Sequence, residues 1–391
     1  MGKSGRHPIH SMCSYLGCFP PEVPRRVLEK YVPERGLVVD PFCGSGTTLV
    51  EAQLSKRKCI GVDLNPLAIA IATAKVQRVE VDAVKARLRE LARGFGGDAD
   101  TEAVPDDVRI IFHPRTLAQL VHLQGALDLS RPEDLFLRGA LLGIMHGKHR
   151  KDGGTAYLSI DMPNTFSMSP EYVRKFVRRH RLHQPPVDVF VKLKERVEWL
   201  LRDGPLPEGS SAAVVQGDAT RLADLLKRLE VEQVDAVVTS PPYLGVLRYG
   251  AFNWIRLWFL GYQPAAVDRT LDGTDSLDRY LAFMTSFLMG ASKVLKQGAP
   301  LILVIGDVKE FGSEVRLAER VWEELKELVP FEFENLMEDR FDEGAKTTRI
   351  WGEERKGRAT PMDRILVLRK KRGQAARSRT PVALVPRDSG R

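Results

Sequence analysis

The chain has 391 residues, of which 43% are hydrophobic and 28% are charged, and its formal net charge is +8. This composition excludes collagen-like, disordered and small disulfide-stapled proteins, and the length suggests about two domains or one large domain with an insertion. No apolar run reaches the roughly 18 residues of a membrane helix, and the N-terminus lacks the apolar segment of a signal peptide. The four cysteines fit a reducing compartment, so we expect a cytoplasmic protein without a membrane partner.

Most of the positive charge lies in two segments. Residues 146–183 carry eight Lys and Arg against three acids, and residues 371–391 carry six against one, which leaves the rest slightly acidic. Two basic patches on a near-neutral body are typical of nucleic-acid binders, although solvated helix faces and basic tails give the same pattern. The 371–391 tail is rich in Arg, Gly, Ser and Pro, which predicts disorder.

Strand and helix patterns alternate at both ends of the chain. Apolar strands are predicted at 37–40 and 59–62, each before a loop and a helix, and further strands at 213–215, 234–238, 300–305 and 364–368. Successive strand–helix units predict an α/β fold with a doubly wound, mostly parallel sheet. We assign this sheet to residues 1–80 and 210–370, and we interpret residues 81–209 as a large, mainly helical insertion.

A glycine-containing loop, Asp40-Pro41-Phe42-Cys43-Gly44-Ser45-Gly46-Thr47-Thr48, follows the first strand. Its two glycines let the backbone approach a ligand, and free amides at the following helix start favour an anionic group. Asp63 lies at the tip of the next strand, where an acid can accept hydrogen bonds from both hydroxyls of a ribose. Leu49 replaces the third glycine of a dinucleotide-binding motif, and a plain tight turn is the alternative interpretation.

The tetrapeptide Ser240-Pro241-Pro242-Tyr243 follows another buried strand, at the edge where open α/β sheets bind ligands. An exocyclic amine of a base is a poor nucleophile because its lone pair is delocalised. Ser240 Oγ and the Pro241 carbonyl are suitable acceptors for its N–H groups, and prolines hold such acceptors in place. The ring of Tyr243 offers a face for stacking an extruded base. A Pro-Pro pair after a strand is, on its own, more often a turn.

Together these motifs resemble the S-adenosylmethionine-dependent DNA amino-methyltransferases, which have a Rossmann-like class I methyltransferase fold. The resemblance implies S-adenosylmethionine as cofactor, with Gly44 and Gly46 near its methionine part, Thr47 or Thr48 at its carboxylate and Asp63 at its ribose. Phe19 begins a segment that is similar to the one that, in the family, closes over the methionine part of the cofactor. Asp218 lies in a segment that resembles the one that contacts the cofactor's adenine. The alternatives for these two are a hydrophobic staple and a helix cap. The implied cofactor-binding residues are Phe19, Asp40, Phe42, Gly44, Gly46, Thr47, Thr48, Asp63 and Asp218.

The resemblance also implies a reaction, with Ser240, Pro241, Pro242 and Tyr243 as catalytic residues. In this family a first-position Ser usually accompanies methylation of the cytosine 4-amino group. We therefore expect site-specific methylation of double-stranded DNA by direct displacement on a flipped base. The expected setting is restriction-modification in the nucleoid, with a cognate restriction endonuclease as a candidate partner. Adenine 6-amino methylation, RNA base methylation and a catalytically silent DNA-binding protein are the alternatives.

In the family that the chain resembles, a variable region reads the DNA sequence, and residues 81–209 are the only room for one here, so the resemblance implies that the insertion is the target-recognition region. Its histidines lack a Cys or an acid at ligand spacing, so no metal site is predicted. The oligomeric state is not predicted. The candidate DNA-binding residues, which would mostly contact phosphates, are Lys148, Arg150, Lys151, Arg174, Arg178, Arg179 and Arg181.

Overall fold

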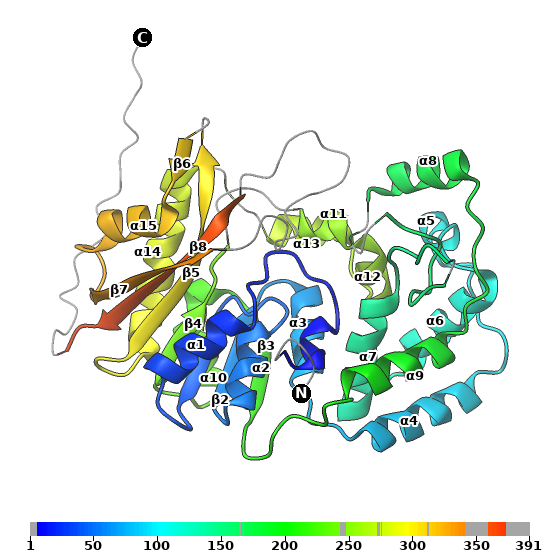
Figure 1. Cartoon of the computed structure of the whole chain (residues 1–391), viewed down its shortest axis with the longest axis horizontal. Coiled ribbons are helices and arrows are strands. Elements are labelled where there is room, and N and C mark those ends of the chain that lie inside the picture. The colour runs from blue at the N-terminus through cyan, green and yellow to red at the C-terminus, as the bar shows by residue number, and fades with distance from the viewer. Residues whose placement is uncertain are drawn as a thin grey trace, which may run out of the picture.

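The structure is a computed structural model that describes residues 6–152, 154–163, 166, 168–242, 248–271, 274, 276–310, 313–340 and 359–372. A sheet flanked by helices forms one part of the molecule, and a helical part lies beside it (Figure 1). None of the helices in these ranges combines the length and the apolarity that crossing a bilayer requires.

The sheet has the strand order β3-β2-β1-β4-β5-β8-β7, with β6 paired to β5. Strands β3 to β5 along this order run parallel, whereas β8 is antiparallel to β5 and β7 is antiparallel to β8. The predicted doubly wound, mostly parallel sheet is therefore confirmed. The strands are β1 Leu37–Asp40, β2 Lys58–Asp63, β3 Ala212–Gln216, β4 Ala236–Thr239, β5 Pro300–Glu310, β6 Ser313–Val315, β7 Phe331–Arg340 and β8 Ala359–Lys370.

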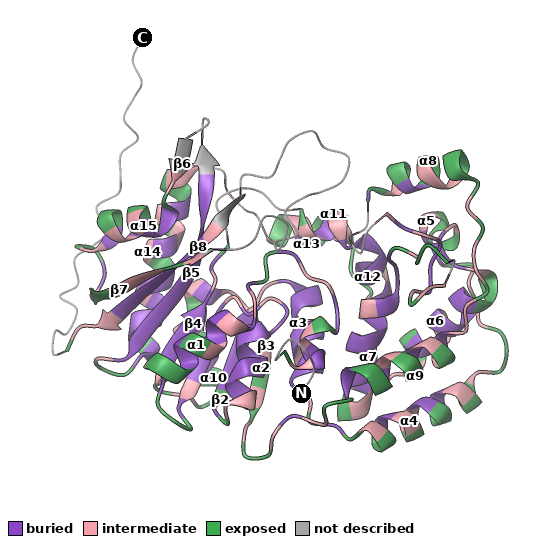
Figure 2. Ribbon diagram, in the orientation of Figure 1, coloured by how far each residue is buried: buried purple, intermediate pink, exposed green. Residues whose placement is uncertain are grey.

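Helices cover both faces of the sheet because neighbouring strand residues point to opposite sides. Val38 packs in a core with residues of α1 and α2, and Val39 packs in a second core with residues of α10, α14 and α15. Figure 2 shows that the faces of α1, α10, α14 and α15 turned to the sheet are buried while their outer faces are exposed, whereas α2 and α3 have no exposed residue. These helices are α1 Glu22–Tyr31, α2 Thr47–Leu54, α3 Pro66–Lys75, α10 Leu222–Arg228, α14 Leu277–Val294 and α15 Leu317–Leu325.

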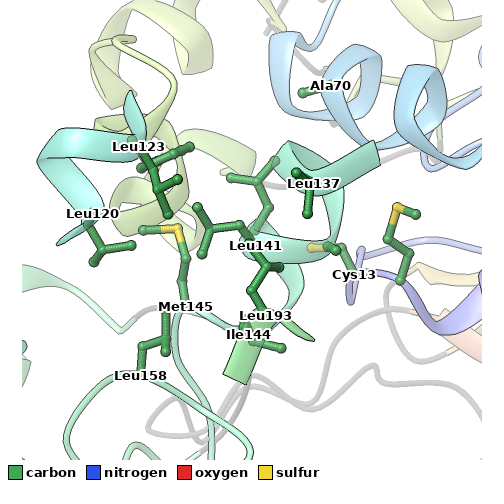
Figure 3. Packing of buried hydrophobic residues seen from close by; sticks show 14 of the residues in the cluster. Cys13, Ala70, Leu120, Leu123, Leu137, Leu141, Ile144, Met145, Leu158 and Leu193 are labelled. Carbon is green, nitrogen blue, oxygen red and sulfur yellow. The ribbon is translucent and has the colours of Figure 1, made fainter. Parts of the chain in front are cut away.

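The predicted helical insertion is confirmed between α3 and β3. Helix α7 lies at its centre, where Leu137, Leu141 and Ile144 pack against side chains from α6, α9 and the N-terminal segment (Figure 3). The insertion helices are α4 Val81–Gly94, α5 Asp106–Arg109, α6 Pro114–Ala126, α7 Pro132–Ile144, α8 Pro170–His180 and α9 Val189–Leu200. The shorter helices α11 Tyr249–Phe252, α12 Trp254–Phe259 and α13 Pro264–Thr270 follow the tetrapeptide, and two 3-10 turns, Pro8–Ser11 and Ala219–Arg221, complete the described elements.

Two glycines one turn apart bring α7 against the sheet domain. A Cβ on Gly139 would overlap Ala74 of α3, and a Cβ on Gly143 would overlap the carbonyl oxygen of Met12. The buried guanidinium of Arg256 in α12 adds a polar link, because it donates hydrogen bonds to the Leu142 carbonyl of α7 (3.0 Å) and the Ser14 carbonyl of the N-terminal segment (3.3 Å). The insertion is thus packed against the sheet domain at close range.

Replacing Gly143 by Ala should lower the free energy of unfolding by about 2 kcal/mol or more, because the new methyl group has no space. Gly125 in α6 is the matched control, since a Cβ there meets no atom within 4 Å. Gly125→Ala should leave stability unchanged or raise it by up to about 1 kcal/mol through helix propensity. Urea unfolding measures both variants, and equal effects would contradict close packing at Gly143.

Candidate active site

A cavity of about 250 Å³ lies beyond the carboxyl ends of β1, β2, β3 and β4. Its walls come from the N-terminal segment, the glycine loop, the tip of β2, the turn after β3 and the start of the tetrapeptide. The fold therefore brings together segments that lie up to about 220 positions apart in the sequence. The residues singled out from the sequence that line the cavity are Phe19, Phe42, Gly44, Thr47, Asp63, Asp218, Ser240, Pro241 and Pro242.

Asp40 is buried beneath the cavity and does not line it. Its Oδ1 accepts hydrogen bonds from Thr239 Oγ1 (2.5 Å) and from the amide of Phe42 (3.2 Å). Burial raises the pKa of Asp40 to about 6, although these hydrogen bonds lower it. The carboxyl group thereby joins the end of β1 to the end of β4.

The two loop glycines have different surroundings, although both have a positive φ (+48° for Gly44 and +78° for Gly46). Gly44 lines the cavity, and a Cβ there would lie 3.3 Å from the ring of Tyr15. Gly46 precedes α2 and lies against Ala72 of α3, which a Cβ would approach to 3.1 Å. Gly46 therefore serves helix packing, and Thr48 is fully buried in α2.

Asp63 lies at the tip of β2 with its carboxylate already oriented by the backbone. Oδ2 accepts a hydrogen bond from the Gly44 amide (2.8 Å), and Oδ1 accepts one from the Asn65 amide (2.8 Å). Burial raises the pKa of Asp63 to about 6, against the effect of these hydrogen bonds. Each carboxylate oxygen retains a lone pair for another donor, so the group can accept the two hydroxyls of a ribose.

Ser240 begins the loop after β4 and carries a hydroxyl with unused hydrogen-bonding capacity. Its Oγ is buried and has no hydrogen-bond partner among the described residues, yet the residue lines the cavity. A buried hydroxyl without a partner is costly, which makes this atom a candidate for contact with a ligand. Pro241 and Pro242 line the same wall, and Tyr243 lies outside the described residues.

Asp218 has the helix-cap role that the sequence analysis gave as an alternative, and it also lies at the cavity. Its Oδ1 accepts hydrogen bonds from the amide and the hydroxyl of Thr220 (both 2.8 Å), which caps the 3-10 turn Ala219–Arg221. The residue also lines the cavity. The cap uses Oδ1 and fixes the side chain at the cavity wall.

Two tyrosines escaped the sequence analysis as site residues. Tyr15 and Tyr249 both line the cavity, and their rings stack with centroids 5.6 Å apart. The Tyr15 hydroxyl accepts a hydrogen bond from Asn65 Nδ2 (2.9 Å), which joins the N-terminal segment to the tip of β2. Neither tyrosine lies in a motif, and only the fold places the two rings together.

The predicted DNA-binding residues are all exposed, and several lie on α8. Arg174 forms an ion pair with Asp107 (2.6 Å), whereas Arg178 and Arg179 have no acidic partner among the described residues. Aromatic rings accompany the charges: the Tyr172 and Phe176 centroids are 5.9 Å apart, and His180 follows at 4.4 Å from Phe176. In Figure 1, α8 lies at the upper right of the view, and α11 and α13 lie near its upper centre. Of the predicted basic tail, residues 373–391 lie outside the described ranges.

Comparison with known proteins shows what the segment around the glycine loop is similar to. A family model described as DNA methylase, N6_N4_Mtase, matches residues 4–74, which include the glycine loop and Asp63. A 97-residue stretch is 30% identical to the type II methyltransferase M.MjaII of Methanocaldococcus jannaschii; it covers 23% of this chain and 18% of that protein. The chain thus spans under a fifth of the curated relative it matches. The predicted resemblance to amino-methyltransferases of the N4/N6 class is confirmed, and this class implies S-adenosylmethionine as cofactor.

Two solved structures are similar to this chain in fold. TrmN from Thermus thermophilus is 12% identical with a TM-score of 0.33, over 90% of this chain and 48% of the other. The rRNA methyltransferase aviRa from Streptomyces viridochromogenes is 13% identical with a TM-score of 0.35, over 90% and 85% of the two chains.

The affinity for S-adenosylmethionine should fall as the pH drops below about 6, because the raised pKa of Asp63 means that its carboxylate becomes protonated there. Protonation of the Asp63 carboxylate should raise the Kd of S-adenosylmethionine roughly tenfold between pH 7 and pH 5. Calorimetric titrations over this range measure the effect. Asp63→Asn should bind weakly with a flat pH profile.

Asp40→Asn is the matched control, because the pKa of Asp40 is also raised to about 6 but the residue does not line the cavity. This variant should retain the inflection. An inflection that persists in Asp63→Asn and disappears in Asp40→Asn would contradict the role of Asp63.

Proposed function

We propose that this protein is an S-adenosylmethionine-dependent DNA methyltransferase that acts on the 4-amino group of cytosine in double-stranded DNA. One observation carries the proposal. Asp63 and the hydroxyl of Ser240, which has no hydrogen-bond partner among the described residues, line one cavity, within a chain whose residues 4–74 match a DNA methylase model. A cofactor and a target base would therefore meet at the same sheet edge.

The cavity residues fit the cofactor. Asp63 would accept the ribose hydroxyls, Gly44 would bring the backbone close, and Phe19 would cover the apolar part from the N-terminal segment. Asp218 would contact the adenine from the turn after β3. When bound, S-adenosylmethionine supplies a methyl group on a positively charged sulfur.

Ser240 would prepare the amine for attack. Its Oγ lacks a partner among the described residues and could accept an N–H of the target amine, and the Pro241 carbonyl could accept the other. These bonds draw the amine out of conjugation with the ring and orient its lone pair toward the methyl group. The cavity wall formed by the two prolines has little conformational freedom, so the acceptors are preorganised.

The first-position serine supports cytosine over adenine through the family pattern. The alternatives are adenine 6-amino methylation, RNA base methylation and DNA binding without catalysis. The methyl-labelling experiment described below distinguishes them. We extend the proposal to site-specific modification beside a cognate restriction endonuclease, in the cytoplasm with the nucleoid DNA.

Helix α8 would hold the DNA, and the insertion would recognise the target. Arg178 and Arg179 project from an exposed face, where they could neutralise phosphates, and Tyr172 and Phe176 add stacking surface. The position of α8 and α11 along the upper edge of the view in Figure 1 supports this path for the DNA.

Incubation with methyl-labelled S-adenosylmethionine should label double-stranded DNA, and digestion to nucleosides should give 4-methylcytosine. Chromatography with mass detection identifies the product. Labelled 6-methyladenine alone would contradict the base assignment, label in RNA alone would contradict the substrate, and no label in either would favour a silent DNA-binding protein.

Ser240→Ala should reduce methyl transfer by about 10²- to 10³-fold, because one preorganised acceptor is lost at the reacting amine. The Kd of S-adenosylmethionine should change by less than about threefold, since Asp63 and Gly44 are unaltered. Single-turnover rates and calorimetry separate the two effects. A large loss of cofactor affinity with an unchanged transfer rate would show that Ser240 belongs to the cofactor site instead.

Replacing Arg178 and Arg179 together by Ala should weaken DNA binding and reduce the slope of log K against log salt by about 2, one unit per lost phosphate contact. Arg89 and Arg93 are the matched control, because they are exposed on α4, away from α8. Their double Ala variant should keep the wild-type slope. An unchanged slope for the α8 variant would remove this helix from the DNA interface.

A further inference from the structure

A buried lysine lies behind the glycine loop and belongs to none of the motifs. Lys75 is the last residue of α3, and only 1% of it is exposed. Its Nζ donates a hydrogen bond to Ser45 Oγ (3.2 Å) and pairs with no carboxylate among the described residues. A buried ammonium group without an anionic partner is costly, so this placement calls for an explanation.

Ser45 connects the lysine to the cavity. Its residue is 3% exposed and lines the cavity wall beside Gly44. Its Oγ also lies 3.0 Å from the Sγ of Cys18, which lines the same cavity from the N-terminal segment. The chain of contacts from Lys75 through Ser45 therefore leads from the interior of the sheet domain to the ligand space.

The direction of these hydrogen bonds follows from the groups. An ammonium can only donate, so Ser45 Oγ must accept from Lys75 and turn its own hydrogen elsewhere. The nearby Cys18 sulfur is a weak acceptor. The positive charge polarises the hydroxyl, which makes Ser45 a strong donor toward an anionic group in the cavity.

We propose that Lys75 is a positioning residue that acts through Ser45 to hold the carboxylate of the cofactor's methionine part. This inference rests on the proposed function. The carboxylate is the only anionic group of S-adenosylmethionine, and the acid Asp63 would repel it at the other side of the glycine loop. Burial lowers the pKa of Lys75, and an anion bound at Ser45 would favour its charged form.

The test compares S-adenosylmethionine with its decarboxylated analogue, which differs only by loss of the carboxylate. Lys75→Met removes the charge and keeps an unbranched side chain of similar length. Ser45→Ala removes the hydroxyl between Lys75 and the cavity and leaves the lysine in place. We expect each variant to weaken binding of S-adenosylmethionine about 10- to 100-fold, as for the loss of a hydrogen bond to a charged group. The Kd of the decarboxylated analogue should change by less than about threefold. Isothermal titration calorimetry measures the Kd of each ligand for the wild type and for both variants.

Lys58→Met is the matched control, because Lys58 is exposed at the start of β2, and it should bind both ligands as the wild type does. If Lys75→Met fails to fold, Ser45→Ala carries the test alone. Equal losses for both ligands, or no loss for either, would overturn the inference and leave the proposed function intact. Failure of the wild-type protein to bind S-adenosylmethionine would overturn both.

Discussion

The site depends on one buried hydrogen bond between the ends of two neighbouring strands. Thr239 Oγ1 at the end of β4 donates to Asp40 Oδ1 at the end of β1 over 2.5 Å, and both side chains are buried. The glycine loop starts directly after Asp40, and the tetrapeptide starts directly after Thr239. This contact therefore sets the distance between the part of the cavity that would hold the cofactor and the part that would hold the target amine.

The helical part is held against this centre by close packing and buried polar contacts. Gly139 and Gly143 let α7 approach α3 and the N-terminal segment. The hydrogen bonds of Arg256 connect α12 to α7 and to the N-terminal segment. The N-terminal segment in turn supplies the Tyr15 and Cys18 walls of the cavity. Val173 packs the basic helix α8 into the hydrophobic core of this helical part.

The sequence was sufficient for the elements whose signals are local. The buried strands and the acid at the tip of β2 follow from residue type and periodicity, and the structure has them at the predicted places. Strand β7 begins with alternating Phe and Glu, which is the pattern of a half-buried strand, but our sequence predictions relied on apolar runs and did not include it. The roles of Gly46 beside α3, and of Tyr15, Tyr249 and Lys75, arise from contacts between distant segments, which no local pattern encodes.

An isotope-trapping experiment tests most directly whether one cavity joins cofactor and DNA. Protein loaded with methyl-labelled S-adenosylmethionine is mixed with double-stranded DNA and a large excess of unlabelled cofactor, and the label in DNA is measured after one turnover. Our account predicts that a substantial part of the bound label appears on cytosine before it can exchange. Complete release of the label into the free cofactor pool, with none on DNA, would contradict it.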